Sequence, residues 1–302
     1  MAERDPKNDR MMRRVALAAV IVATALAGMK TLAFVLTDSM AMLGSLADSA
    51  LDVFASFLNL LAVNQALTPA DREHRFGHGK AEPLAGLAQG ALIGASAVFL
   101  AFESIQRLLA PHAISNGGIG LVVMAVSIGL TLVLVLAQRY VVRRTGSIAI
   151  QSDSAHYISD ILVNAGVIVG IIGASMLGWT AADPLVGLAI AGVIAHTAWE
   201  VFRQSYDQLM DHELPETDRE RIRDILLAHS DIHGIHDLRT RAAGMQSFIQ
   251  VHIELDPLLS LRRAHEISDE AEAQIRTAFP KAEIIIHQDI AGYERPAPLA
   301  QS

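Results

Sequence analysis

The sequence predicts an α-helical polytopic membrane protein, with six transmembrane helices followed by a small cytoplasmic α+β domain. Its 302 residues are 52% hydrophobic and only 19% charged, with a mean hydropathy of +0.35. Soluble domains carry more charge than this. Several apolar runs also reach the roughly 17 to 25 residues that a bilayer-spanning helix requires. Beyond Met210 regular charge returns, in patterns with strand and helix periods.

Six apolar segments are the candidate spans. We expect a transmembrane domain over residues 15–210, preceded by a polar cytoplasmic segment over 1–14. The first apolar run, from Val15 to Thr37, is too long for the core of a cleavable signal peptide, and more spans follow it. The segments lie at 15–37, 40–67, 82–110, 117–142, 147–178 and 183–209.

Basic residues fix the expected orientation. The connections near 37–38, 111–118 and 178–183 contain no Lys or Arg, and the alternate ones are basic. Basic connections remain in the cytoplasm, so both ends of the chain are expected there. The residues that carry this argument are Lys7, Arg10, Arg13, Arg14, Arg72, Arg75, Lys80, Arg139, Arg143 and Arg144.

Residues 211–290 predict a separate cytoplasmic domain with the element order αββαβ. Helical patterns cover 217–229 and 261–279, and strand patterns cover 235–242, 247–253 and 283–288. Such a unit forms a small two-layer α+β domain. The last residues, 291–302, contain two prolines and are expected to form a disordered tail.

Two pairs of ionisable residues interrupt the second and fifth apolar segments. Asp48 and Asp52 are four residues apart, as are His156 and Asp160, so each pair lies on one helix face. At 1.5 Å per residue, both pairs fall near the middle of a hydrocarbon core of about 30 Å. We therefore expect the four side chains to meet at one depth.

Charge at that depth requires a compensating cation. Insertion scales give about 2.5 to 3.5 kcal/mol for each charged residue at a helix centre, and the nearby base Lys30 is expected to point outward. Three carboxylates and one imidazole match tetrahedral zinc, and the lack of cysteine favours zinc, iron or manganese over cuprous copper. Protons can occupy the same groups when the metal leaves, which is the requirement for exchange.

Two weaker clusters lie outside the spans. Asp71, His74 and His78 are spaced so that one helical turn and a loop could bring them round a metal, and a solvated charged loop remains equally open. In the soluble domain a metal site and a set of surface histidines both remain open. Its candidate ligands are His236, His252, His265, His287 and Asp289.

Several functions are disfavoured. The chain has no Walker A motif, no His-Glu-x-x-His motif and no nucleophile elbow, which argues against ATP-driven pumping and zincin proteolysis. The formal charge of −8 gives no indication of nucleic-acid binding. We call Asp48, Asp52, His156 and Asp160 the quartet. An intramembrane metalloenzyme would need a further acid or base beside the quartet, and we expect none. A membrane-anchored metal sensor or scaffold without transport remains the alternative to a transporter.

The combined motifs resemble the cation diffusion facilitator family, in particular its bacterial zinc and ferrous-iron efflux pumps. The resemblance rests on the two intramembrane pairs and on the segments 76–82, 141–145, 236–241 and 286–289. It implies a homodimeric metal/proton antiporter, without an organic cofactor, in the bacterial inner membrane. It also implies a metallochaperone-like cytoplasmic domain with a binuclear site at the dimer contact, a second site on the loop, and zinc, cadmium and ferrous iron as substrates.

Overall fold

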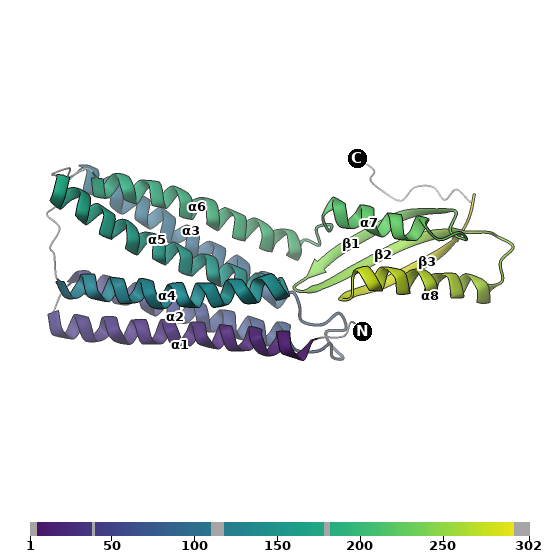
Figure 1. The fold of residues 1–302 in the computed structure, drawn as a ribbon, viewed down its shortest axis with the longest axis horizontal. Helices are drawn as coiled ribbons and strands as arrows, with labels where there is room; N and C mark the ends of the chain where they lie inside the picture. Colours follow the sequence, from purple (N-terminus) through teal and green to yellow (C-terminus); the bar gives the residue numbers. More distant parts are fainter. Residues whose placement is uncertain (1–4, 38–39, 110–117, 178–181, 293–302) are drawn as a thin grey trace. The chain divides into compact units, whose positions relative to one another are not determined.

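The computed structural model describes residues 5–37, 40–109, 118–177 and 182–292. The chain divides into two compact units, a helical unit over Asp5–Leu209 and a second unit that begins at Met210. The elements of each unit are labelled in Figure 1. Most of the predicted tail, from residue 293 onward, lies outside the described residues.

The helical unit contains six long helices, four of which are long and apolar enough to cross a membrane within the described residues. These four candidate spans are Pro6–Val35, Ala81–Leu109, Val122–Thr145 and Pro184–Leu209. The other two helices, α2 and α5, carry the predicted pairs of ionisable residues. The bounds are α1 (Pro6–Thr37), α2 (Met40–Ala66), α3 (Ala81–Leu109), α4 (Gly118–Thr145), α5 (Ile148–Leu177) and α6 (Ala182–Leu209).

The first helix begins earlier than its apolar segment predicts. It starts at Pro6, inside the polar stretch 1–14 that was expected to precede the helices. The carboxylate of Asp5 accepts a hydrogen bond from the backbone N–H of Lys7 at 2.9 Å, as an N-cap does. Proline is favoured at the first helical position, and Asp9 lies in the first turn, where negative charge is stabilised. Local capping therefore extends the helix beyond its apolar part.

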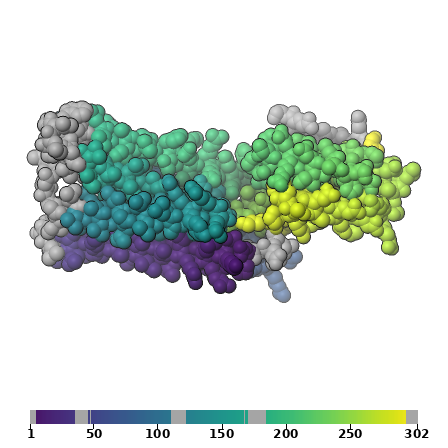
Figure 2. All heavy atoms as spheres, viewed as in Figure 1, coloured from purple at the N-terminus to yellow at the C-terminus, as the bar shows by residue number. Residues whose placement is uncertain are grey.

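Helix α5 is central to the bundle, because it packs against α2, α3, α4 and α6. The first and fourth helices, coloured purple and teal, lie side by side along one face of this unit (Figure 2). Between α3 and α6, the buried residues Ile93, Ala97, Ile194 and Ala198 form an apolar cluster. A central α5 places its polar side chains in the interior of the bundle.

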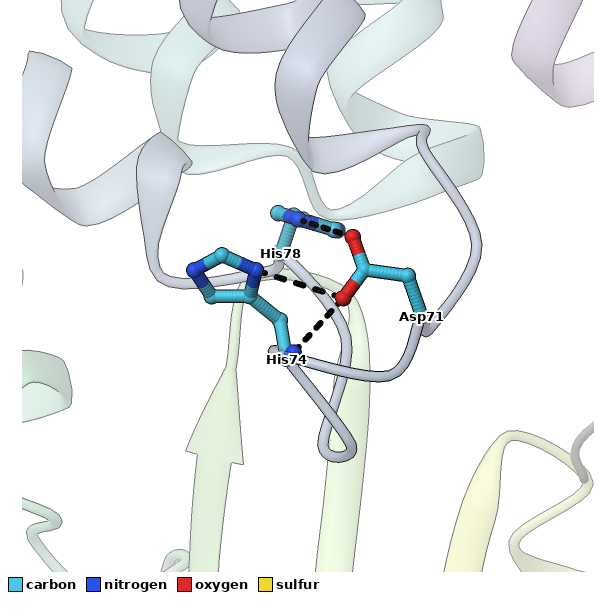
Figure 3. Close-up of side chains that lie close together, drawn as sticks. All are labelled: Asp71, His74 and His78. Atoms are coloured by element: carbon cyan, nitrogen blue, oxygen red, sulfur yellow. Dashed lines mark hydrogen bonds and ion pairs between the residues drawn. The ribbon is translucent and has the colours of Figure 1, made fainter.

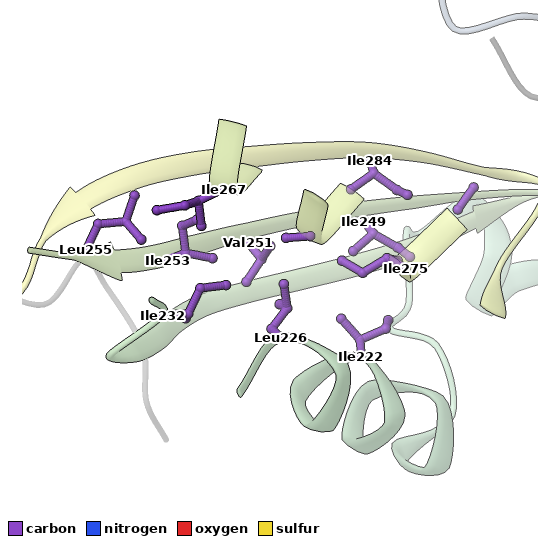
Figure 4. Close-up of a cluster of buried hydrophobic side chains, with 12 residues drawn as sticks. Ile222, Leu226, Ile232, Ile249, Val251, Ile253, Leu255, Ile267, Ile275 and Ile284 are labelled. Atoms are coloured by element: carbon purple, nitrogen blue, oxygen red, sulfur yellow. The ribbon is translucent and has the colours of Figure 1, made fainter. Parts of the chain in front are cut away.

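The second unit has the predicted order αββαβ. Its sheet has the strand order β1-β2-β3, with β1 antiparallel and β3 parallel to β2. Both helices pack on one face of the sheet, where twelve buried residues form the core (Figure 4). The elements are α7 (Glu216–Leu227), β1 (Gly234–Ala243), β2 (Gln246–Leu255), α8 (Leu261–Ala278) and β3 (Ala282–Ile290).

The central strand β2 separates an apolar face from a polar one. Ile249, Val251 and Ile253 are buried beneath the helices. Since successive side chains alternate between faces, His252 and Glu254 point to the opposite face, away from the helices. The polar face of the sheet is therefore the place where the histidines of this unit can meet.

Candidate metal sites

Helices α2 and α5 bring three of the four predicted intramembrane residues together. The His156 Nε2 atom lies 3.1 Å from Asp52 Oδ1 and 3.9 Å from Asp160 Oδ2. Asp52, His156 and Asp160 each offer one ligand atom within 4.8 Å of the others. These side chains are 17%, 8% and 33% exposed. The transmembrane group, as we call this trio, is thus arranged around one buried imidazole.

Asp48 does not belong to this group in the described structure. It is exposed, one helical turn before Asp52. Residues four apart are separated by about 6 Å along a helix axis. The long imidazole of His156 spans that separation on α5, whereas the two short aspartates on α2 do not. The four predicted ligands therefore form a group of three with the fourth nearby.

Lys30 differs from the expectation that it points outward. Its Nζ atom donates a 2.6 Å hydrogen bond to Ser49 Oγ, and Ser49 is buried on α2. Helix α1 packs along α2, so the lysine can turn toward its neighbour inside the bundle. A positive charge therefore lies beside the turn of α2 that carries Asp48.

A fifth ionisable residue of the bundle interior, Asp153, was missed by the sequence reasoning. It is 0% exposed and lies on α5, three residues before His156. Its two carboxylate oxygens accept hydrogen bonds from Gln89 Nε2 at 3.2 Å and from Gln138 Nε2 at 2.7 Å. The expectation that no further acid lies near the quartet is therefore wrong. The spacing Asp153, His156, Asp160 places all three on one helix face and could have revealed it.

Tyr157 fixes the rotation of α5 beside the transmembrane group. Its hydroxyl lies 2.6 Å from Ser56 Oγ on α2 and donates a 3.2 Å hydrogen bond to the carbonyl oxygen of Ala19 on α1. The tyrosine is 1% exposed, so these hydrogen bonds are shielded from solvent. With α5 held against both helices at this turn, the adjacent His156 faces α2.

The predicted loop residues also come together, in the connection between α2 and α3 (Figure 3). Asp71 lies 3.3 Å from His74 Nδ1 through one carboxylate oxygen and 3.4 Å from His78 Nε2 through the other. The segment is a series of turns, without the helical turn that the spacing allowed. Proline at 69 and Gly77, whose φ is +79°, disfavour helix here. The three residues form the loop group.

Backbone hydrogen bonds hold the loop group in shape. The backbone N–H groups of His74 and Glu73 donate to Asp71 Oδ1 at 2.6 and 2.9 Å. These donors, the His74 N–H above all, lower the pKa of the Asp71 carboxyl. Asp71 is therefore held as a carboxylate between two imidazoles, which is the form that binds a cation.

In the second unit, the sheet register aligns three histidines in one row. His236 pairs with His252 across β1 and β2, and His252 pairs with His287 across β2 and β3. The carboxylate of Asp289 lies 3.1 Å from His236 Nε2, 2.7 Å from His252 Nδ1 and 3.5 Å from His287 Nε2. The sheet group consists of His236, His252 and Asp289, whose ligand atoms lie within 4.8 Å of one another. His287 lies at its edge.

His265, the remaining predicted ligand, is not part of this row. It lies on α8, which covers the other face of the sheet, and its imidazole is 3.6 Å from Asp269 of the same helix. A side chain on the helix layer cannot reach the polar face of its own sheet. Within one chain the sheet group is therefore formed without His265.

Two acids beside the sheet group were also missed. Glu254 lies 3.1 Å from His236 Nδ1 and orients that imidazole. Asp237 lies in a bulge of β1, with a φ of +50°, and its carboxylate is 3.9 Å from His252 Nε2. Arg239 donates two hydrogen bonds to Asp237. The bulge turns this carboxylate toward the histidine row, which residue spacing could not predict.

All three groups combine imidazole nitrogen with carboxylate oxygen, a donor set that fits a divalent transition metal. Comparison with known proteins gives the family. The model of the cation efflux transmembrane domain matches residues 16–210, and that of the cation efflux protein cytoplasmic domain matches residues 214–291.

Two cation-efflux pumps match over nearly the whole chain. The cation-efflux pump FieF of Salmonella paratyphi A is 42% identical over 280 residues, which cover 93% of each chain. FieF of Klebsiella pneumoniae subsp. pneumoniae is 43% identical over the same share of each. A solved zinc form of the transporter CzrB is 33% identical, covers 28% of this chain and 99% of its own, and has a TM-score of 0.27. The chain belongs to the cation diffusion facilitator family of cation efflux transporters.

Proposed function

We propose that the chain is a six-span antiporter that exports zinc from the cytoplasm in exchange for protons, and that cadmium and ferrous iron are further substrates. The site of exchange is the transmembrane group. The observation that carries this proposal is the short contact of His156 with Asp52 and Asp160, at 3.1 and 3.9 Å, inside a helical transmembrane domain. An imidazole between two carboxylates can hold either a metal ion or protons, and metal binding to such ligands releases protons.

In this proposal the cycle is alternating access around the transmembrane group. Metal enters from the cytoplasm and displaces protons, and it leaves on the other side when protons return. Asp48 becomes the fourth ligand when its turn of α2 moves toward His156. A ligand that binds the two conformations with different affinity can shift their populations, and metal and proton both do so here.

The loop group and the sheet group are proposed as further metal sites of a homodimer in the bacterial inner membrane, with both termini in the cytoplasm. His265 of the partner subunit would complete a binuclear site with His287 and the sheet group. This assignment explains a histidine that lies on the wrong face of its own sheet. Metal at the dimer contact would stabilise the dimer.

The test is metal uptake into inverted vesicles with an imposed pH gradient. We expect Asp52→Asn to lower zinc uptake by at least 100-fold. Removing a residue that only hydrogen-bonds to a metal ligand already lowers metal affinity or activity about 10- to 100-fold, and Asp52 is proposed as a ligand itself. Asp48→Asn, which removes the ligand that joins the site only when α2 moves, should cost less. Equal uptake by Asp52→Asn and wild type would exclude the transmembrane group as the transport site.

The same vesicles separate the proposal from the alternative of a metal sensor or scaffold. A sensor binds zinc through the loop and sheet groups and changes the pH on neither side of the membrane. Zinc-dependent proton movement in the wild type, lost in Asp52→Asn and retained in His252→Ala, supports the antiporter. Zinc binding without proton movement supports the sensor.

A further inference from the structure

Asp153 is a buried acid with neutral partners. It is 0% exposed, and its carboxylate oxygens contact the side-chain amides of Gln89 on α3 and Gln138 on α4. Within the described part of the chain no Lys, Arg or His forms an ion pair with it. An isolated carboxylate in an apolar interior is strongly disfavoured, and such a group takes up a proton or a cation instead.

The two glutamines form a clamp that suits both charge states of Asp153. Each amide has a donor nitrogen and an acceptor oxygen, so it can donate to a carboxylate or accept from a carboxylic acid. Gln89 and Gln138 are 2% and 0% exposed, and their Oε1 atoms are buried without a hydrogen-bond partner among the described residues. If one glutamine amide rotated so that its nitrogen and oxygen exchanged places, its Oε1 atom could accept a hydrogen bond from a protonated Asp153. Only one proton is needed to make the site neutral.

The charged groups around Asp153 are few. On its own helix His156 and Asp160 follow it by one and two turns, and α2 contributes Asp52 through its contact with His156. On α3 the acid Glu82 is buried and accepts a 3.0 Å hydrogen bond from the backbone N–H of Ile148 at the start of α5. The arginines of α4 are exposed.

No hydrogen bond or ion pair joins Asp153 to His156 in the described structure, so the acid is not a member of the transmembrane group. Side chains three residues apart on a helix are nevertheless neighbours, with Cβ atoms about 5 to 6 Å apart. A doubly charged metal ion on His156 would therefore act strongly on a charge at Asp153, because the intervening medium has a low dielectric constant.

We propose that Asp153 is a proton-carrying residue of the exchange cycle, distinct from the metal ligands. The inference rests on the proposed antiport. When a metal ion binds to the transmembrane group, the O–H bond of the Asp153 acid breaks and its proton is released to water on the cytoplasmic side. The carboxylate then accepts from both glutamine amides. When the metal ion leaves, one proton binds to Asp153 again and one glutamine oxygen accepts it.

The experiment counts protons released per zinc bound by the full chain in nanodiscs. Calorimetry in buffers of different ionisation enthalpy gives this number. His74→Ala and His252→Ala in the background confine zinc to the transmembrane group. We expect Asp153→Asn, which keeps the shape and hydrogen bonds, to release close to one proton fewer than the background chain around neutral pH. Zinc affinity should fall by about tenfold or more, because the coupling that expels the proton strengthens zinc binding by the same free energy. Asp153→Glu, which keeps the acid, should release the full number.

Glu82→Gln is the matched control, since it neutralises another buried acid of the same unit and should leave the count unchanged. An equal count in Asp153→Asn and the background chain would overturn the assignment, and so would an equal decrease in Glu82→Gln. If Asp153→Asn does not fold, infrared difference spectroscopy provides the test. The wild type must lose a protonated carboxyl band when zinc binds, and the frequency of that band must be shifted in Asp153→Glu. An unshifted band refutes the proposal. Zinc transport by wild type without proton counterflow would instead refute the antiport.

Discussion

A methyl group added at Gly90 tests how closely α3 and α6 must approach. A Cβ atom built at Gly90 would lie 3.2 Å from the backbone nitrogen of Phe202 and 3.4 Å from the carbonyl oxygen of Ala198. Both atoms belong to the backbone of α6, which cannot turn aside as a flexible side chain can. The two helices must therefore separate by a few tenths of an ångström to accept Gly90→Ala.

The expected cost follows from that geometry. Overpacking a filled interior costs about 1 to 3 kcal/mol, against a gain in helix propensity of about 0.8 to 1.0 kcal/mol for replacing glycine with alanine. Gly94 provides the matched control, because a Cβ there would meet only the Ala198 Cβ atom, at 3.8 Å. The expected order of stability is Gly94→Ala at or above wild type and Gly90→Ala below it.

The assay is thermal unfolding of the purified chain in one detergent, followed by tryptophan fluorescence and by size-exclusion chromatography after heating. Gly90→Ala should unfold at a lower temperature than Gly94→Ala, and it should reduce zinc uptake in vesicles because α6 packs on α5. Equal unfolding temperatures for the two variants would refute the claim that backbone contact limits the approach of α3 and α6.

Three further predictions concern the candidate sites. Tyr157→Phe should destabilise the chain by about 1 to 3 kcal/mol, measured by unfolding, because it leaves the buried Ser56 hydroxyl without its 2.6 Å partner. In the monomeric cytoplasmic unit, His252→Ala should weaken zinc binding at least tenfold, as measured by calorimetry, whereas His265→Ala should leave the zinc affinity unchanged. Weaker zinc binding by His265→Ala would contradict the sheet register. The pKa of the Asp71 carboxyl is lower in the folded chain than in the unfolded chain. The ionised carboxylate therefore stabilises the folded turn fully at a pH above the unfolded-state pKa. This stabilisation should disappear as the pH falls through the lower folded-state pKa. Carbon-detected NMR titration of the carboxyl measures this, and an ordinary pKa would contradict it.

Much of the fold could be predicted because apolar length and periodicity determine it locally. The six apolar segments end within a few residues of the six helices, apart from the polar first turns of α1. The strands of the second unit also lie where alternation predicts them. The parallel pairing of β3 with β2 could not be predicted in this way, since it depends on contacts between distant segments.

The candidate sites were predicted less completely, because ligand spacing does not give the reach of a side chain. Asp48 and Asp52 share a helix face, yet only Asp52 is close enough to contact His156. His265 lies on the other face of the sheet from the histidine row, so its predicted place in a site between two subunits is not tested within one chain. Asp153 was missed because it lies only six residues after the predicted start of an apolar segment, where an acid can be mistaken for an end residue. Its burial depends on amides from two other helices.

Helix α5 carries both the candidate ligands and the hydrogen bonds that attach it to its neighbours. One face of this helix carries Asp153, His156 and Asp160, and the helix packs against four others. His156 contacts Asp52 on α2, whereas Asp153 contacts α3 and α4. A change of charge on this face therefore alters attachments to three helices at once. Loading and unloading a cation could move α5 relative to its neighbours without any separate coupling element, because the site and the attachments belong to the same three turns.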